Sequence, residues 1–280
     1  MKPFKIIYIY TLDKGSKSTI NIFALDMRIT HLIFLLNFLI FLSCKKQSFT
    51  LTTIEGKLIE INDSIPKKND IESFIEPFRT HLEKDLDSVI AYAKDTYSKS
   101  DGTLNTAIGN FMADAIFKQA NPIFNRRTGN NIDMVLLNHG GIRSIISKGD
   151  VTVRNMFELM PFENKIVIVA LKGQQMDSMV DYLCNSRRAN PVSNLKLTID
   201  NDFKPVEALI NGKPIIKNNT YFVATNDYLY NSGDNMRFFR PNDSVFDLNY
   251  KIRNALIDYL KKIDTLKPII DDRFTQIHTK

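Results

Sequence analysis

The sequence has few of the side chains from which disulfides and metal centres are built. It contains two cysteines, Cys44 and Cys184, and four histidines among 280 residues. Because Cys44 would become the first residue after removal of a leader, Cys184 has no partner for an intrachain disulfide or a cysteine-based metal site. The histidines occur in none of the spacings Asp-x-His, Gly-Asn-His or His-x-His. No motif for a metal-dependent hydrolytic centre is therefore present.

The sequence also has no apolar run long enough to be predicted as a membrane-spanning helix, and no cluster of positively charged residues. The apolar run at residues 32–42 is shorter than the roughly 20 residues that a membrane-spanning helix needs. Five of the 37 basic residues and two of the 31 acidic residues precede Cys44, which leaves 32 basic against 29 acidic residues. The net charge of +6 is thus largely a property of the leader. Nothing in the charge pattern indicates nucleic-acid binding.

Residues 1–43 have the pattern of a secretory signal peptide, with a basic start, a short apolar core and a small residue before the cleavage site. Leu42-Ser43-Cys44 resembles a bacterial lipoprotein box, which implies lipidation of Cys44. We therefore expect a protein of the cell envelope, held to a bacterial membrane on its periplasmic or surface side. An uncleaved anchor is the alternative. Met27 is a second plausible start, so residues 1–26 can be an overextended gene model.

Residues 44–84 are expected to form a lipidated tether and a connector helix. A β-like segment covers residues 49–61, and from Asp70 the apolar residues recur at helical spacing as far as Ile90. Asp70 is a natural N-cap, and Pro77 should kink this helix or delay its start. We expect the apolar side of the helix to pack on the domain that follows.

Residues 85–280 interleave strand and helix patterns, which predicts a single mixed-sheet domain of the α/β (α+β) class. Expected strands are residues 134–137, 165–173, 191–199 and 221–225, the last of them the final clear strand; expected helices are residues 153–159, 174–183, 246–263 and one starting at Ile108. Residues 121–131 are expected to be a loop with two solvated arginines, and Asn211-Gly212 predicts a hairpin turn. There is no internal repeat.

The central strand ends in a polar tip, Asn138-His139-Gly140-Gly141-Ile142-Arg143. Gly140 and Gly141 have no Cβ, so the backbone there can take positive φ and a ligand can come close. Arg143 offers five donors in a fixed fork, which suits a carboxylate, a phosphate or a ribose diol. The alternative is an ordinary turn with a solvated arginine.

Four stretches in this order resemble the C-terminal, substrate-binding domain of the 5'-nucleotidase family. They are Gly109-Asn110 with Ala113-Asp114-Ala115, the tip from Asn138 to Arg143, Met160-Pro161-Phe162 followed by a strand and Lys172-Gly173, and Tyr228 with Asn231-Ser232-Gly233-Asp234. The resemblance implies the fold of that domain and a nucleotide or nucleoside as its ligand. Pro161 should end the preceding helix and leave Phe162 on a loop.

The resemblance also implies roles for single residues. Phe162 and Tyr228 would enclose the base, Asn138 would bind the base or ribose, Arg143 the ribose or phosphate, and Asp234 the ribose hydroxyls, with Gly140 and Gly141 shaping the loop. Aromatic faces bind any base, and a carboxylate accepts hydrogen bonds from hydroxyls. Without the resemblance, core packing is the simpler interpretation of the two aromatic residues.

Full-length members of that family carry an N-terminal metallophosphatase domain with two metal ions, for which this sequence shows no motif. We therefore expect no cofactor in this chain, and two divalent metals in a separate metallophosphatase subunit that completes a 5'-nucleotidase-type phosphohydrolase in nucleotide catabolism. The family often has an arginine shortly before Gly-Asn, but residues 104–108 contain none, so phosphate binding would fall to the partner's metals. The alternatives are a non-enzymatic nucleoside- or nucleotide-binding surface lipoprotein and a scaffold with a vestigial site.

Overall fold

A computed structural model describes residues 29–35, 38, 51, 53–62, 64–66 and 68–277. The chain divides into two compact units, residues 1–66 and 67–280. In the first unit, residues 29–35 and 38 are helical, and residues 51 and 53–61 form no strand, so the expectation of a β-like segment was wrong for these residues. Cys44 and most of the predicted signal peptide lie outside the described residues. No helix within the described ranges has both the length and the hydropathy needed to cross a bilayer.

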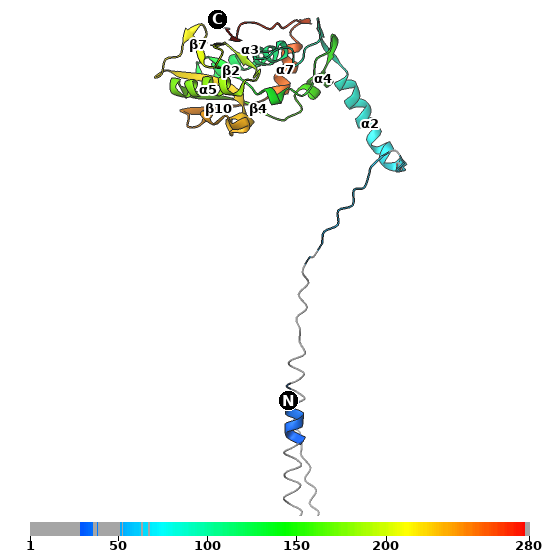
Figure 1. Ribbon diagram of the computed structural model, residues 1–280. Helices are drawn as coiled ribbons and strands as arrows, with labels where there is room; N and C mark the ends of the chain where they lie inside the picture. Colours follow the sequence, from blue (N-terminus) through cyan, green and yellow to red (C-terminus); the bar gives the residue numbers. More distant parts are fainter. Residues whose placement is uncertain are drawn as a thin grey trace, which may run out of the picture. The chain divides into compact units, whose positions relative to one another are not determined.

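A five-stranded mixed sheet is the centre of the second unit, with strand order β10-β4-β9-β2-β5 (Figure 1). Its strands are β2 (Met134–Leu136), β4 (Lys165–Lys172), β5 (Val192–Ser193), β9 (Thr220–Asn226) and β10 (Ser244–Lys251). β2 runs parallel to β9, whereas β4 is antiparallel to both β9 and β10. The mixed sheet predicted from the sequence is confirmed.

Two smaller sheets flank it. One has the order β11-β1-β3, made of β11 (Thr265–Leu266), β1 (Val89–Ala93) and β3 (Gly149–Thr152); the other has the order β12-β6-β7-β8, made of β12 (Phe274–Gln276), β6 (Leu195–Ile199), β7 (Pro205–Ile210) and β8 (Lys213–Pro214). Asn211 and Gly212 join β7 to β8 with φ values of 50° and 73°. Positive φ at both positions is what a two-residue type I′ hairpin requires, so the predicted turn is confirmed.

The helices are α2 (Asn69–Leu86), α3 (Ala107–Thr128), α4 (Val153–Leu159), α5 (Gly173–Ser186), α6 (Asp227–Tyr230) and α7 (Ile252–Leu260), with 3-10 turns at His139–Gly141, Gly233–Asn235 and Arg237–Phe239. Helices α3 and α7 pack on one face of the central sheet and α5 on the other, whereas α2 projects away from it (Figure 1). On β4, Ile166 and Ile168 belong to the core that includes α3 and α7, while Val167 and Val169 belong to the core that includes α5. A strand buried on both faces is fixed in register by its side-chain alternation.

Two elements differ from the sequence-based expectation. The expected loop over residues 121–131 is helical as far as residue 128, because α3 continues through Pro122 to Thr128 and is capped by Gly129 in a left-handed conformation; only residues 129–131 are outside helix and strand. Phe124 is fully buried on that last stretch, and its packing outweighs the helix-breaking tendency of proline. The helix expected over residues 246–263 is split, since Ser244–Lys251 pairs with β4 and only Ile252–Leu260 is helical. Pairing with an available sheet edge overrides local helical periodicity.

Helix α2 forms as expected, but it starts at Asn69 and runs through Pro77, and it does not pack as expected. None of its residues is buried. Phe74 and Phe78 are 72% and 67% exposed, and Ile71 and Leu82 are also open to solvent. The contacts of α2 include ion pairs of Arg154 with Glu83 and Asp87. These four apolar residues, the apolar stripe of α2, therefore lack a cover among the described residues.

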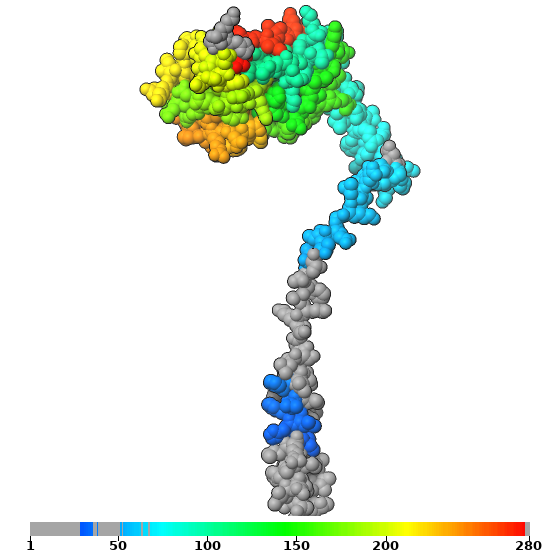
Figure 2. Space-filling model, in the orientation of Figure 1, coloured from blue at the N-terminus to red at the C-terminus, as the bar shows by residue number. Residues whose placement is uncertain are grey.

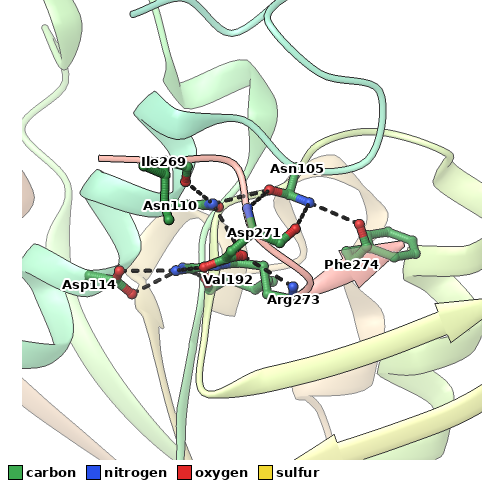
Figure 3. Close-up of polar contacts among 8 residues, drawn as sticks. All are labelled: Asn105, Asn110, Asp114, Val192, Ile269, Asp271, Arg273 and Phe274. Atoms are coloured by element: carbon green, nitrogen blue, oxygen red, sulfur yellow. Dashed lines mark hydrogen bonds and ion pairs between the residues drawn. The ribbon is translucent and has the colours of Figure 1, made fainter. Parts of the chain in front are cut away.

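The Gly109-to-Ala115 stretch lies in the first half of α3 and, together with Asn105, holds the C-terminal segment, residues 269–274, by hydrogen bonds and ion pairs (Figure 3). Asn110 Nδ2 donates to the carbonyl of Ile269 at 2.9 Å, and Asn105 Nδ2 donates to that of Phe274 at 2.9 Å. Arg273 pairs with Asp114 at 3.0 Å and Asp271 at 2.7 Å. The space-filling view shows this segment, in red, on the surface beside α3 (Figure 2). The motif thus has a structural role here.

The ion pair of Asp271 with Arg273 generates a stability prediction. Burial raises the pKa of Asp271, but hydrogen bonds from Arg273 outweigh it, so that the pKa lies below its usual value. Asp271→Asn should lower the free energy of unfolding at pH 7 by about 1.5 to 3 kcal/mol, the range for hydrogen bonds to charged groups. Because the pKa of Asp271 is lower in the folded state, the ion pair stabilises the protein fully at pH values above the pKa of the unfolded state, about 3.9. This stabilisation is lost as the pH falls through the pKa of the folded state.

The difference between wild type and Asp271→Asn should therefore shrink near pH ~3, measured by denaturant unfolding followed by circular dichroism. Asp272→Asn is the matched control, because Asp272 is highly exposed and pairs with Lys196 at 3.4 Å. It should change stability by less than about 0.5 kcal/mol. Equal losses in both variants at pH 7 would contradict the role assigned to the Asp271–Arg273 pair.

Candidate functional site

The order and direction of the strands bring three loops to one edge of the central sheet. β2 and β9 are parallel neighbours, so their carboxyl ends lie together. β4 runs the other way, with Ile166 opposite Asn226, so its start lies at the same edge. The loops at residues 137–143, 160–164 and 227–235 therefore converge, although about 90 residues separate the first from the last.

A pocket of about 300 Å³ lies where these loops meet. It is lined by Asn138, Gly140, Gly141, Arg143, Met160, Phe162, Asn164, Tyr228 and Asp234. The structure thus brings together all seven residues that the sequence nominated for substrate binding. Sequence reasoning missed Met160 and Asn164, although both flank Phe162 on the loop it had singled out.

Asp234 is the polar centre of the pocket. Its carboxylate accepts one hydrogen bond from Asn138 Nδ2 at 2.7 Å and one from the Tyr228 hydroxyl at 2.9 Å. The hydrogen bond to Asp234 is the main cause that raises the pKa of Tyr228 above its usual value. The Tyr182 hydroxyl donates to the Asp234 carbonyl at 2.9 Å. A carboxylate has about four acceptor positions, so Asp234 can still accept hydrogen bonds from a ligand's hydroxyl groups.

Gly140 and Gly141 serve close packing, and the expectation of positive φ at them was wrong. The described glycines with positive φ are Gly129, Gly149 and Gly212. A Cβ on Gly141 would lie 3.0 Å from Asn138 Oδ1, and one on Gly140 would lie 3.3 Å from Asn138 Nδ2. The two glycines therefore make room for the buried Asn138 amide, which points to Asp234.

The loop that carries Asp234 has its own strained positions. Ser232 and Asp234 have φ values of 71° and 51°, which non-glycine residues seldom adopt. A Cβ on Gly233 would lie 2.4 Å from the Tyr228 ring. Glycine at this position therefore lets the ring lie against the loop and reach Asp234. Non-glycine residues in the left-handed region cluster at ligand sites, where the surrounding structure holds them.

Phe162 and Tyr228 are 41% and 47% exposed, which argues against core packing as their role. Pro161 follows the end of α4, and Phe162 lies on a loop, as expected. The Arg143 guanidinium carbon lies 5.8 Å from the centre of the Phe162 ring, within the range of a cation–π contact. Among the residues that the structure describes, no carboxylate pairs with Arg143, so its fork can still donate to an anion or a diol.

The base of the glycine loop is held by residues that sequence reasoning did not select. The backbone N–H of His139 donates to Asn190 Oδ1 at 3.0 Å, and the ring Nδ1 of His139 lies 3.3 Å from the Ala189 carbonyl. Lys99 Nζ donates to the Ile142 carbonyl at 3.1 Å. No sequence pattern joins these positions, because the contacts form only in the folded chain.

The donor set of the pocket does not fit a two-metal centre. Asp234 is the one carboxylate among the lining residues, and both of its oxygens already accept hydrogen bonds. Across the described ranges, no group of three or more His, Cys, Asp or Glu side chains is placed to hold a metal ion. Two-metal hydrolysis needs several such ligands around each pair of ions. The polar side chains that line the pocket are one carboxylate, one guanidinium, two amides and the Tyr228 hydroxyl.

Comparison with known proteins decides the family. The model of the 5'-nucleotidase C-terminal domain matches residues 86–241. The chain belongs to this family. The family predicted from the four stretches of sequence is thereby confirmed.

Similar proteins are longer than this chain. It is 25% identical over 238 residues to the trifunctional nucleotide phosphoesterase protein YfkN of Bacillus subtilis, covering 79% of this chain and 16% of that protein. It is 23% identical over 242 residues to human 5'-nucleotidase, covering 78% of this chain and 42% of that protein. The chain thus spans less than half the length of each of these relatives, whose C-terminal part it matches.

The fold is shared with solved structures. A 5'-nucleotidase precursor from Thermus thermophilus superposes with a TM-score of 0.62 at 21% identity, covering 77% of this chain and 44% of that chain. NAD nucleotidase of Haemophilus influenzae superposes with a TM-score of 0.58 at 15% identity, covering 76% of this chain and 42% of that chain. At such identities the likeness concerns the fold, and it confirms the predicted α/β (α+β) mixed-sheet domain.

Proposed function

We propose that this chain is the nucleotide- or nucleoside-binding specificity subunit of a two-chain 5'-nucleotidase-type phosphohydrolase in nucleotide catabolism. The observation that carries the proposal is that two exposed aromatic rings, an amide, an arginine and a carboxylate line one pocket together. Its volume of about 300 Å³ is at the lower end of the range for small-molecule sites.

Each group in the pocket suits one part of a nucleoside. The rings of Phe162 and Tyr228 offer π faces on which any base can stack. Asp234 accepts hydrogen bonds from ribose hydroxyls, and Asn138, already bound to Asp234, has a carbonyl oxygen left for the base or ribose. Arg143 is the only cation among the lining residues and would contact the ribose or phosphate.

A second chain is proposed for the chemistry. In the bovine and human relatives named 5'-nucleotidase, the match to this chain covers 42% of the protein and lies in its C-terminal part. The larger remainder precedes the match. We propose that a separately encoded metallophosphatase subunit takes its place and supplies two divalent metals. The apolar stripe of α2 directly precedes the matched region at residue 86, and it is the surface on this chain that such a subunit would cover.

The proposed location is the cell envelope. Lipidation of Cys44 would hold the domain at a bacterial membrane, on the periplasmic or surface side, through the tether formed by the residues after it. Nucleotides outside the cytoplasm would then be the substrates. A non-enzymatic lipoprotein that captures nucleosides or nucleotides at the surface has the same pocket and the same anchor, and is the alternative that the experiments below separate.

The first expected outcome concerns the aromatic pair. Phe162→Ala should weaken the binding of adenosine or AMP by about 1 to 3 kcal/mol, the contribution of one stacking aromatic, measured by titration calorimetry. Circular dichroism should show an unchanged fold, because Phe162 is not part of the core. Tyr92→Ala is the control, since Tyr92 is similarly exposed but lies on β1 outside the pocket. Unchanged affinity, or unfolding of Phe162→Ala, would contradict the proposed role.

The two-chain arrangement predicts that phosphate release needs both chains. With manganese or zinc, the purified chain should release no phosphate from AMP or UDP-glucose, and turnover should appear on mixing with the metallophosphatase subunit. The double variant Phe74→Ser with Phe78→Ser should still bind adenosine but should give no turnover on mixing.

Other results would lead to other conclusions. Steady turnover by this chain alone, reduced in Asp234→Ala, would show that the catalytic residues lie here and would overturn the proposal. Saturable adenosine binding without turnover under any pairing would favour the non-enzymatic lipoprotein.

The lipid anchor predicts incorporation of a fatty-acid analogue at Cys44. Metabolic labelling should mark the wild-type chain and leave Cys44→Ala unlabelled, because Cys184, the other cysteine, is buried in the core. Cys184→Ser is the control and should remain labelled. Equal labelling of wild type and Cys44→Ala would exclude this site of attachment.

A further inference from the structure

The loop from Met160 to Asn164 supplies three of the nine residues that line the pocket. It contains no helix or strand, and Pro161 has no N–H with which to anchor it. Phe162 is exposed on this loop, so its own side chain does little to fix its position. A stacking surface has to be held in place to bind tightly, so contacts from outside the loop must provide the rigidity.

Those contacts come from three consecutive residues where β10 ends and α7 begins. Arg253 Nη1 donates to the carbonyls of Met160 at 3.2 Å and Phe162 at 3.4 Å, while Nη2 pairs with the Glu163 carboxylate. Lys251 pairs with the same carboxylate, and the N–H of Ile252 donates to the Asn164 carbonyl at 3.0 Å. Every residue of the loop except Pro161 therefore forms a hydrogen bond or an ion pair with residues 251–253.

Arg253 has features that helix α7 alone does not explain. It is 4% exposed, and burying a guanidinium is costly unless it is well paired. It lies in the first turn of α7, where the helix dipole disfavours a cation, and its buried Nε has no hydrogen-bond partner among the residues that the structure describes. Its guanidinium carbon lies 4.0 Å from the centre of the Phe157 ring, which supports the plane from α4. The hydrogen bonds of its guanidinium go to the pocket loop.

We infer that Arg253 is the positioning residue that sets Phe162 against the base. The inference rests on the proposed nucleoside site. It adds to that site a residue outside the pocket lining, whose guanidinium donates hydrogen bonds to the carbonyls on either side of Pro161. Only a guanidinium can donate to two carbonyls and a carboxylate at once with a planar, preorganised group. Lysine at this position would keep the charge and lose that geometry.

A double-mutant cycle separates positioning from general destabilisation. Arg253→Met should raise the Kd for adenosine about tenfold, within the range that one stacking aromatic contributes. In a Phe162→Ala background the same change should alter Kd less than about twofold, because its effect passes through Phe162. Arg253→Lys should resemble Arg253→Met. Arg127→Met is the control, because Arg127 also donates to two carbonyls, those of Asp247 and Leu248, but lies outside the pocket lining, and it should leave Kd within about twofold.

Equal effects of Arg253→Met in both backgrounds would overturn the inference. Hydrogen exchange gives a readout that needs no ligand: amides of Phe162, Glu163 and Asn164 should exchange faster in Arg253→Met, with β9 amides unchanged. Uniformly faster exchange, or unchanged loop exchange, would also overturn it. If Arg253→Met fails to fold, Arg253→Lys decides by the same two measurements. If the wild type binds no adenosine, the proposed function fails, and exchange alone decides the role of Arg253.

Discussion

The parallel pairing of β2 with β9, with β4 antiparallel beside them, is the constraint on which the rest of the structure depends. It places the ends of two strands and the start of a third at one edge, and so assembles a pocket from three distant loops. Both faces of these strands are buried, so a shift of one residue would exchange the side chains facing α5 with those facing α3. The geometry of the pocket therefore inherits the rigidity of the core.

The sequence was sufficient to find seven of the nine pocket residues because short stretches of it resemble a known family. Glycines also mark the tip after β2, and a proline marks the end of α4 before Phe162. The sequence was insufficient where a partner distant in sequence decides the structure. Residues 246–251 have a helical pattern, yet they complete the sheet beside β4. Arg253 looks like one more charge on an amphipathic helix, and its contacts with residues 160–163 exist only after folding. The pattern of α2 predicted a helix but could not say what its apolar stripe contacts.

The stretch that resembles the family around Gly109 shows that a family motif need not touch a ligand. Asn110 and Asp114 hold the C-terminal segment through Ile269 and Arg273, on a different part of the domain from the lining of the pocket. The stretches after β2 and β9 serve the pocket, whereas this one closes the fold around α3. A motif therefore identifies the domain, and the structure shows which of its residues line the pocket and which hold the fold together.

The hydrogen bonds around Asp234 also indicate how a nucleotide would lie in the proposed complex. Asn138 and Tyr228 use two acceptor positions of the carboxylate, which leaves others for ribose hydroxyls, so binding need not break the existing network. A phosphate placed near Asp234 would face repulsion between like charges. Arg143, the only lining cation, is exposed beside Phe162 and would attract that group instead. The base would then stack between the rings, the ribose would lie at Asp234, and the phosphate would point towards solvent, where metals supplied by another subunit can reach it.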